Sequence, residues 1–277
     1  MANSKLGKFL RGAFIFTLTF YLVRLLLIIV LTMILATLTT LAGLFDPNGK
    51  FVYSINKLWT WAILRAGGVK LKIIGLEKLD PRRPYIFMVN HQSNVDIPIL
   101  VQSLPRFQLR WIAKRELLWV PFFGWAMWAT KHITVDRANP LNAVKSLRRA
   151  KRRIAAGISV VVFPEGTRSR DGQVQRFKKG GFLLAVETDT EIVPIAIKGS
   201  RDLLPSGAWR LRSGTVEVVV DQPVSIAGYR PGNLRLLSDQ VRQTIAGHLR
   251  QSSRATSTAS ETAQSLLNDR NLEKQQI

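Results

Sequence analysis

A long apolar stretch near the amino terminus constrains this chain more than any other feature of its sequence. From Ala13 to Leu44 the residues are almost all apolar, and Arg24 is the one charged residue. The segment Leu25–Leu44 carries no charge and has about the 20 residues that a helix needs to cross the hydrocarbon core of a bilayer. The run is far too long for the core of a signal peptide. We therefore expect it to attach the mature protein to a membrane; the alternative is a helix buried in a soluble core.

A second apolar stretch, Phe51–Ala66, is short for a span and contains charged residues. Its Tyr53, Trp59 and Trp61 are the amphipathic aromatic residues typical of a membrane interface. Basic residues before the first stretch favour a cytoplasmic amino terminus, and a single crossing would then place the rest of the chain outside. We favour a two-helix hairpin that enters one leaflet and returns to the same side. Two full crossings are the alternative.

The rest of the chain alternates short β-branched runs with helical segments. This order predicts an α/β fold, a mixed sheet flanked by helices. The predicted strands are Val69–Ile74, Tyr85–Val89, Gln108–Ala113, His132–Val135, Ser159–Phe163, Ile192–Ile197 and Thr215–Val220, and the predicted helices are Val95–Ser103, Pro121–Thr130, Leu141–Ala156 and Gly181–Glu187. We place a membrane-associated helical hairpin in residues 1–66, an α/β domain in 67–251 and a loosely ordered polar tail in 252–277.

The chain is strongly basic, with 40 Lys and Arg against 18 Asp and Glu and a formal net charge of +22. Such a charge predicts a polyanionic partner: nucleic acid, an acidic membrane leaflet or a phosphorylated substrate. Many cations lie on the predicted helix Leu141–Ala156, which is either a membrane-facing surface or an ordinary solvated face. Because no nucleic-acid-binding motif accompanies them, we expect no nucleic acid partner.

The chain contains no cysteine, which excludes disulfides, thiolate zinc sites and cysteine nucleophiles. Its three histidines, His91, His132 and His248, are scattered without the spacing of metal ligands. We therefore expect no metal site.

A histidine and a carboxylate, His91 and Asp96, stand where a predicted strand gives way to a predicted helix. A hydrogen bond from one imidazole nitrogen to Asp96 would fix the tautomer of His91 and stabilise its charged form. The other nitrogen would then accept a proton from a substrate hydroxyl near neutral pH. The alternative is an Asp that caps a helix beside an unrelated loop histidine.

A second polar group follows the predicted strand Ser159–Phe163, in the sequence Pro164-Glu165-Gly166-Thr167-Arg168-Ser169. The carboxyl end of a strand in an α/β sheet is the usual place for a ligand. Gly166 allows close approach of the backbone, Arg168 has the geometry to bind phosphate, and Glu165 holds either Arg168 or a substrate hydroxyl. The alternative is an ion pair between Glu165 and Arg168 that merely closes a turn.

These segments together resemble the four ordered sequence blocks of the glycerolipid acyltransferases, and most closely the bacterial 1-acyl-sn-glycerol-3-phosphate acyltransferase group. The resemblance extends over roughly Val69–Val220. It is carried by Asn90-His91 with Asp96, by Lys114-Arg115-Glu116-Leu117 with Pro121, Gly124 and Arg137, by Phe163 to Ser169, by Phe177-Lys178-Lys179-Gly180 and by Val193-Pro194-Ile195.

The resemblance implies an acyl transfer without an acyl-enzyme. His91, oriented by Asp96, would deprotonate the sn-2 hydroxyl of a lysophosphatidate, which would attack the thioester of acyl-CoA or acyl carrier protein to give phosphatidate. Neither a metal nor a prosthetic group would be needed.

The resemblance also implies the substrate-binding residues, with Arg168, Arg137 and Lys114 as cations for the phosphate and Glu165, Gly166 and Thr167 beside them. A backbone amide near Gly166 or the ammonium of Lys114 would stabilise the oxyanion. Membrane phospholipids, a lysophospholipid acceptor and the acyl donor are the expected partners, and the expected location is the bacterial inner membrane with the catalytic domain on its cytoplasmic side.

Two alternatives stay open. The same chemistry applies to another acceptor, such as glycerol 3-phosphate, another lysophospholipid or a lyso-aminolipid. A non-enzymatic, membrane-bound basic protein that binds anionic lipid or nucleic acid is the second, although such a protein has no need of the His91 and Asp96 pair.

Overall fold

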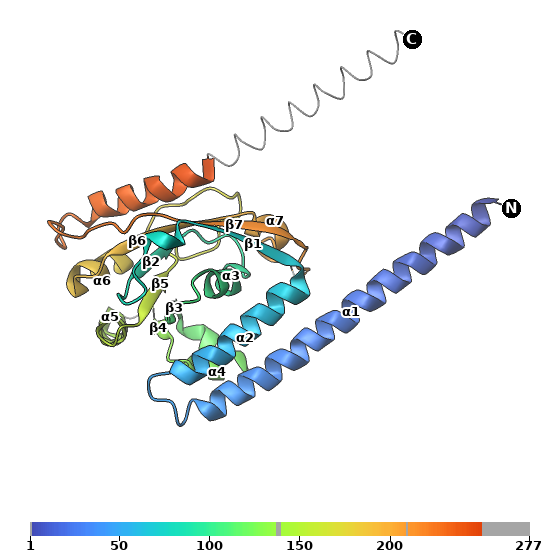
Figure 1. Cartoon of the computed structure of the whole chain (residues 1–277), viewed down its shortest axis with the longest axis horizontal. Helices are drawn as coiled ribbons and strands as arrows, with labels where there is room; N and C mark the ends of the chain where they lie inside the picture. Colours follow the sequence, from blue (N-terminus) through green and yellow to red (C-terminus); the bar gives the residue numbers. More distant parts are fainter. Residues whose placement is uncertain (1, 137–139, 209, 251–277) are drawn as a thin grey trace, which may run out of the picture.

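The computed structural model describes residues 2–136, 140–208 and 210–250 and contains a mixed sheet of seven strands in the order β1-β7-β6-β2-β5-β3-β4 (Figure 1). The strands β6, β2, β5, β3 and β4 are parallel to one another, whereas β7 and β1 run in the opposite direction. The strands are β1 (Val69–Ile74), β2 (Ile86–Val89), β3 (Leu109–Lys114), β4 (Ile133–Val135), β5 (Ser159–Val162), β6 (Ile192–Lys198) and β7 (Gly214–Val220).

The sheet separates two hydrophobic cores, because successive side chains of a strand point to opposite faces. In β2, Phe87 and Val89 belong to one core, and Ile86 and Met88 belong to the other. Both faces are therefore buried, which explains why the central strands are continuous apolar runs. The predictions of the α/β fold and of its seven strands are confirmed, with small shifts at the strand ends.

Helices cover both faces of the sheet. The first core includes residues of α2 (Lys50–Gly67) and α3 (Asp96–Ser103), and the second includes residues of α5 (Pro140–Ala155) and α6 (Gly180–Thr188). Shorter helical segments are η1 (Leu76–Lys78), η2 (Arg115–Trp119), α4 (Phe123–Ala129) and α7 (Ser200–Leu203).

A helix over residues 234–250, which the sequence analysis missed, also covers the second face. Its buried side chains Leu234, Leu237, Val241 and Ile245 recur at helical spacing, so the signal was present in the sequence. The tail predicted over 252–277 lies outside the described residues.

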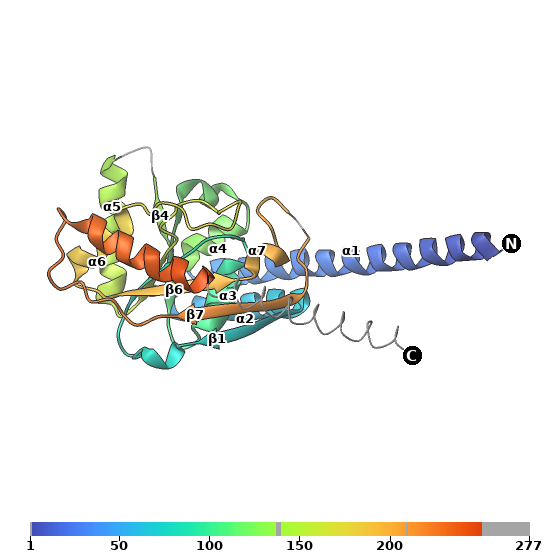
Figure 2. The ribbon, with the colours of Figure 1, turned by 90° about the horizontal axis from the view of Figure 1, so that it is seen from above.

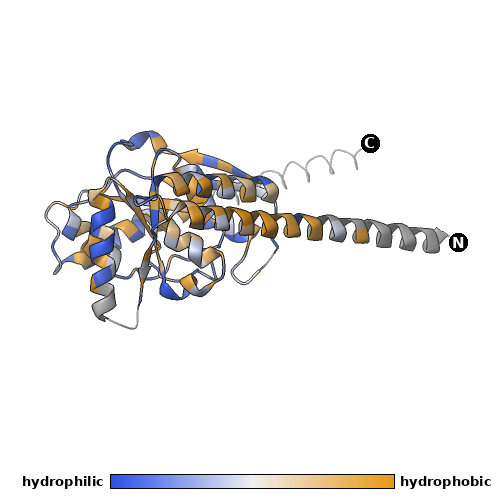
Figure 3. Cartoon of the chain, turned by 90° about the horizontal axis from the view of Figure 1, so that it is seen from below, coloured by the Kyte–Doolittle hydropathy of each residue, from blue (hydrophilic) through white to orange (hydrophobic). Residues whose placement is uncertain are grey.

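The amino-terminal segment forms the long helix α1 (Ala2–Ala42), and α2 turns back along it. The amino-terminal part of α1 extends well beyond the sheet and its helices (Figure 2). Within the described residues, Leu22–Ala42 is the one helical segment long and apolar enough to cross a membrane, and most of its side chains are exposed. In Figure 3 this part of α1 is coloured mostly as hydrophobic. The indole nitrogen of Trp59 donates to Thr32 Oγ1 at 3.0 Å, which joins the two helices.

The turn between α1 and α2 is held by Arg110 of β3. The Arg110 side chain is fully buried, and its guanidinium donates to the carbonyls of Asn48 and Gly49 at 3.0 and 2.9 Å. Burial lowers the pKa of Arg110 to about 10, so it stays charged at neutral pH. The sheet and the amino-terminal helices are therefore connected by hydrogen bonds as well as by apolar contacts.

Candidate active site

The polar residues singled out from the sequence meet at the carboxyl ends of neighbouring parallel strands. His91 follows β2, Glu165 follows β5, and Lys114 is the last residue of β3. Because β5 lies between β2 and β3, these residues share one edge of the sheet. This is the edge at which open α/β sheets bind ligands.

His91 and Asp96 are in direct contact. His91 Nδ1 lies 2.8 Å from Asp96 Oδ2, and the same oxygen accepts the backbone amides of Gln92 and Ser93, both at 2.8 Å. Asp96 is fully buried, whereas the His91 side chain retains 16% of its exposure. When a carboxylate accepts a hydrogen bond from Nδ1–H, the neutral imidazole has no proton on Nε2. The lone pair of Nε2 can then accept a proton. The pair thus has the geometry of a general base with its orienting carboxylate.

The helix-cap alternative does not describe Asp96. The cap position of α3 is occupied by Val95, and Asp96 is the first helical residue. Its carboxylate bonds to amides that precede the helix and to His91, so its local structural role and its contact with the imidazole occur together.

An aromatic stack supports the imidazole ring. The rings of His91 and Phe163 are stacked with centroids 3.9 Å apart and planes 16° apart, and the ring of Trp111 of β3 is stacked with that of Phe163 at 6.0 Å. This stack restricts the orientation of the His91 ring. No local sequence pattern indicates this stack, because it joins residues in or just after three different strands.

Glu165 connects the segments around His91. Its Oε1 accepts the His91 amide at 3.0 Å and its Oε2 accepts the Gln175 amide at 3.1 Å. The His91 carbonyl in turn accepts the Ser169 amide at 2.7 Å. Glu165 is buried, and this burial raises its pKa. No ion pair with Arg168 is present among the described residues, so the turn-closing alternative is wrong.

The cations predicted to bind phosphate differ from one another in their exposure. Arg168 is half-buried and Lys114 is exposed, and neither pairs with a carboxylate in the described part of the chain. Thr167 is exposed at the surface of the same loop. Arg137 lies outside the described residues, although β4 ends just before it at Val135.

Gly166 shapes the turn after β5, but its amide is engaged. It has φ +74°, and its amide donates to the Phe163 carbonyl at 3.0 Å, so in this conformation it is not available to an oxyanion. The side chain of Lys178 lies across Gly166, since a Cβ placed there would be 3.0 Å from Lys178 Nζ. The Lys178 amide donates to the Pro164 carbonyl at 2.8 Å. The run Phe177–Gly180 belongs to the family resemblance, but nothing in the sequence alone assigns a role to Lys178.

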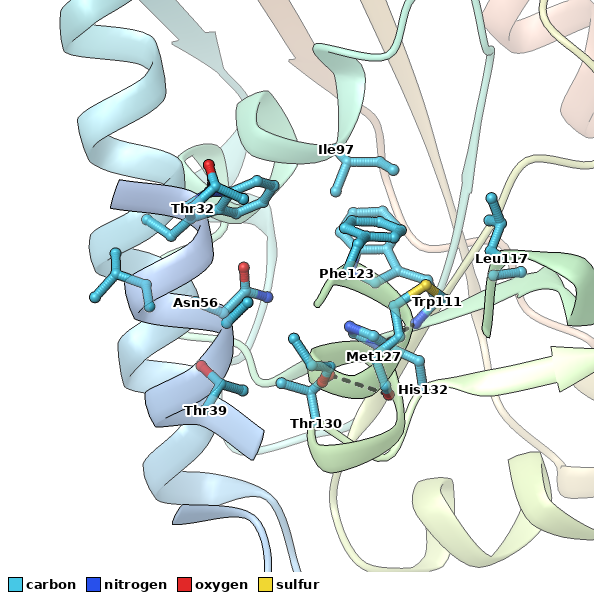
Figure 4. A pocket seen from close by; sticks show the side chains of 15 residues that line it. Thr32, Thr39, Asn56, Ile97, Trp111, Leu117, Phe123, Met127, Thr130 and His132 are labelled. Atoms are coloured by element: carbon cyan, nitrogen blue, oxygen red, sulfur yellow. Dashed lines mark hydrogen bonds between the residues drawn. The ribbon is translucent and has the colours of Figure 1, made fainter. Parts of the chain in front are cut away.

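An apolar cavity of about 100 Å³ lies next to Trp111, one of the stacked aromatic residues. Figure 4 shows Thr32 and Asn56 of the amino-terminal helices on one side and Trp111, Met127 and His132 on the other. His132 accepts the Trp111 amide through Nδ1 at 3.3 Å, and burial lowers its pKa to about 3, so it is neutral. A second cavity of about 590 Å³ lies on the opposite side of the sheet. It is situated between α5 and α6 and reaches Gly166 and Lys178.

Within the described residues, no group of three or more His, Asp or Glu side chains is arranged to hold a metal ion. The expectation that the reaction needs no metal or prosthetic group stays a prediction.

Comparison with known proteins places this site in a family. The 1-acyl-sn-glycerol-3-phosphate acyltransferase of Pseudomonas aeruginosa is 32% identical over 187 residues, which cover 67% of this chain and 71% of that protein. The chain belongs to this acyltransferase family. The family model named Acyltransferase matches residues 70–198, which include every candidate site residue described above.

Two further acyltransferases agree with this assignment. The crystal structure of the 1-acyl-sn-glycerophosphate acyltransferase PlsC from Thermotoga maritima aligns with a TM-score of 0.67 and 26% identity, and covers 84% of this chain and 98% of that chain. The 1-acyl-sn-glycerol-3-phosphate acyltransferase of Chlamydomonas reinhardtii is 36% identical over 198 residues, 70% of this chain and 57% of that protein. The chain therefore spans just over half the length of this relative. The resemblance found in the sequence blocks is confirmed.

Proposed function

We propose that the protein is a 1-acyl-sn-glycerol-3-phosphate acyltransferase. It transfers an acyl group from acyl-CoA or acyl carrier protein to the sn-2 hydroxyl of a lysophosphatidate, which gives phosphatidate. The observation that carries this proposal is the 2.8 Å contact of His91 with the buried carboxylate of Asp96, at a cation-bearing edge of an acyltransferase-family domain.

In the proposed reaction, His91 Nε2 removes the proton of the sn-2 hydroxyl as its oxygen attacks the thioester carbonyl. Asp96 stabilises the imidazolium that forms. The tetrahedral intermediate collapses with cleavage of the carbon–sulfur bond, and the leaving thiolate takes the proton from His91. No acyl-enzyme is formed.

The cations of the same edge hold the charged parts of the substrates. Arg168 binds the phosphomonoester of the acceptor, with Lys114 and Arg137 as further ligands, beside Glu165, Gly166 and Thr167. A guanidinium binds phosphate with two parallel hydrogen bonds, and among the described residues Arg168 has no ion pair with a carboxylate that would occupy its donors. Because the Gly166 amide is engaged, an ammonium, that of Lys114 or Lys178, stabilises the oxyanion.

The acceptor reaches this site from a membrane. We assign residues 1–66 to a hairpin in one leaflet, and residues 67–251 to the catalytic domain on the cytoplasmic side of a bacterial inner membrane. The acyl donor arrives from water. Phospholipids and these two substrates are the partners, and nucleic acid is not one of them.

The decisive experiment is an acyl-transfer assay of the purified full chain with a panel of acceptors. Lysophosphatidate, glycerol 3-phosphate, neutral and zwitterionic lysolipids and a lyso-aminolipid are each offered with acyl-CoA and with acyl carrier protein. We expect the highest kcat/KM for lysophosphatidate and none for the His91→Ala variant. A higher value for another acceptor would move the assignment to that substrate, and the absence of all transfer would leave the non-enzymatic alternative.

A further inference from the structure

The segment between β3 and β4 carries large apolar side chains on its outer surface. Trp119 is 80% exposed, and Trp125 and Trp128 are 50% and 53% exposed. Leu117 and Val120 are exposed beside them. In a water-soluble α/β domain these side chains would face the core, and a cluster of this kind on a surface marks a contact with a protein or a membrane.

This cluster lies beside the amino-terminal helix α1, which also has exposed apolar side chains. Helix α4 packs along α1, and Figure 1 shows α4 beside α1 and α2, away from α5 and α6. The contact is close: a Cβ on Gly43 would lie 2.6 Å from the Cβ of Ala129. The same three helices enclose the cavity of Figure 4.

The local backbone holds this arrangement against its own preference. Phe122 and Lys131, at the two ends of α4, have φ +61° and +59°. Positive φ is costly for residues other than glycine, and such strain persists where the surrounding structure imposes it. The segment is therefore held with its tryptophans outward and is not simply loose.

The polar groups around the cluster fit a lipid surface. Lys131 Nζ lies 4.5 Å from the centre of the Trp128 ring, and the exposed Lys114 and Arg115 precede the cluster. Tryptophan prefers the level of the head groups, and neighbouring cations attract anionic lipids. A protein partner would not require this combination of indole rings and flanking cations.

We propose that residues 115–131 form a membrane-binding element of the α/β domain, distinct from the amino-terminal helices, which inserts Trp119, Trp125 and Trp128 among the head groups of an anionic phospholipid bilayer. The domain thus lies on the membrane at two places, α1 and α4, and the cavity between them is held at the bilayer surface. This proposal goes beyond acyl transfer, and its test does not depend on activity.

The natural absence of cysteine makes the test direct. Trp119→Cys and Trp125→Cys variants of the full chain are labelled with an environment-sensitive fluorophore and placed in vesicles of phosphatidylethanolamine and phosphatidylglycerol that contain nitroxide-labelled lipids. Leu236→Cys is the matched control, because Leu236 is a 67% exposed apolar residue on the helix of residues 234–250.

We expect a blue shift and strong quenching by the nitroxide lipids at positions 119 and 125, and neither at 236. The same result is expected in a His91→Ala background. Labels at 119 and 125 that behave like the label at 236 would overturn the proposal. A water-soluble quencher is added in a parallel measurement. Labels that are shielded from this quencher but are not quenched by the nitroxide lipids would also overturn the proposal, since a protein partner would then cover the cluster. Circular dichroism checks that each variant is folded.

Discussion

The buried carboxylate of Asp96 contacts His91 Nδ1 at 2.8 Å and accepts two backbone amides through the same oxygen. We expect His91→Ala to abolish acyl transfer, and Asp96→Asn to lower kcat by about 10²- to 10⁴-fold, because general base catalysis typically contributes that factor. The measurements are kcat with lysophosphatidate and the fraction of protein bound to membranes, which should not change for His91→Ala. Activity retained by His91→Ala would exclude the proposed base.

Arg168→Ala tests the phosphate site. A hydrogen bond to a charged group contributes about 1.5–3 kcal/mol, so we expect kcat/KM for lysophosphatidate to fall about 10- to 100-fold. The matched control is Arg170→Ala, an exposed arginine of the same loop, which should have little effect. A monoacylglycerol acceptor should be nearly insensitive to Arg168→Ala. An equal loss with that neutral acceptor would show that Arg168 supports the loop instead of the phosphate.

Gly166→Ala and Gly157→Ala form a matched pair. Both glycines have nearly the same φ, +74° and +75°, but a Cβ on Gly166 meets Lys178 whereas a Cβ on Gly157 meets nothing within 4 Å. Each substitution should lower the free energy of unfolding by about 1–2 kcal/mol, the cost of the left-handed backbone, and Gly166→Ala should lose more than Gly157→Ala because of its contact with Lys178. Only Gly166→Ala should also lower kcat.

The double variant Gly166→Ala/Lys178→Ala separates the cost of the left-handed backbone at Gly166 from the effect of the contact with Lys178. If contact with Lys178 disturbs the loop, the double variant should lose no more stability than Gly157→Ala. We expect it to remain poorly active, because the lysine itself is gone, and Lys178→Ala alone should also lower kcat. Full activity of Lys178→Ala would remove this residue from the site. Denaturant unfolding and acyl-transfer rates are the measurements.

The buried Glu165 should make the free energy of unfolding depend on pH, and Glu165→Gln should remove this contribution. Burial raises the pKa of Glu165, so its charged form is less favourable in the folded chain than in the unfolded chain. Its contribution to stability is therefore greatest at low pH and is lost as the pH rises through the folded pKa. The free energy of unfolding of the wild type, minus that of Glu165→Gln, should rise as the pH falls from 7 toward the ordinary range of glutamate. A difference that falls with decreasing pH would contradict this assignment.

The position of the turn between α1 and α2 tests the hairpin. A cysteine in place of Asn48 provides a single labelling site, and a hairpin in one leaflet places it on the side of the catalytic domain. We expect a membrane-impermeant maleimide to label it from the cytoplasmic side alone. Labelling from the outside alone would exclude the one-leaflet arrangement. A cysteine at Leu236 marks the side on which the domain lies.

The sheet was predictable because its signals are local. Runs such as Ile192–Ile197 are apolar at every position and rich in β-branched residues, as expected for strands buried on both faces. The contact of His91 with Asp96 was predictable for the same reason, since the two residues lie close in sequence at the start of a helix.

Other features of the site depend on contacts between distant segments. The stacking of Phe163 on His91 and the bonds from the amides of His91 and Gln175 to Glu165 require the neighbouring position of β2 and β5, which no local pattern specifies. The sequence alone therefore leaves Arg168 and a substrate hydroxyl as the expected partners of Glu165, and it does not indicate the two backbone amides. The outward face of α4 was missed because its aromatic residues resemble those of a core helix.

Arg110 connects the amino-terminal helices to a strand beside the candidate active site. Its guanidinium is committed to two carbonyls of the turn after α1, while its backbone belongs to β3, the strand that ends at Lys114 and contributes Trp111 to the stack against Phe163. The hydrogen bonds of Arg110 therefore connect the turn after α1 to the strand whose Trp111 stacks on Phe163, the ring that in turn stacks on His91. In the membrane-bound state proposed above, these contacts would set the height and inclination of the imidazole above the lipid surface.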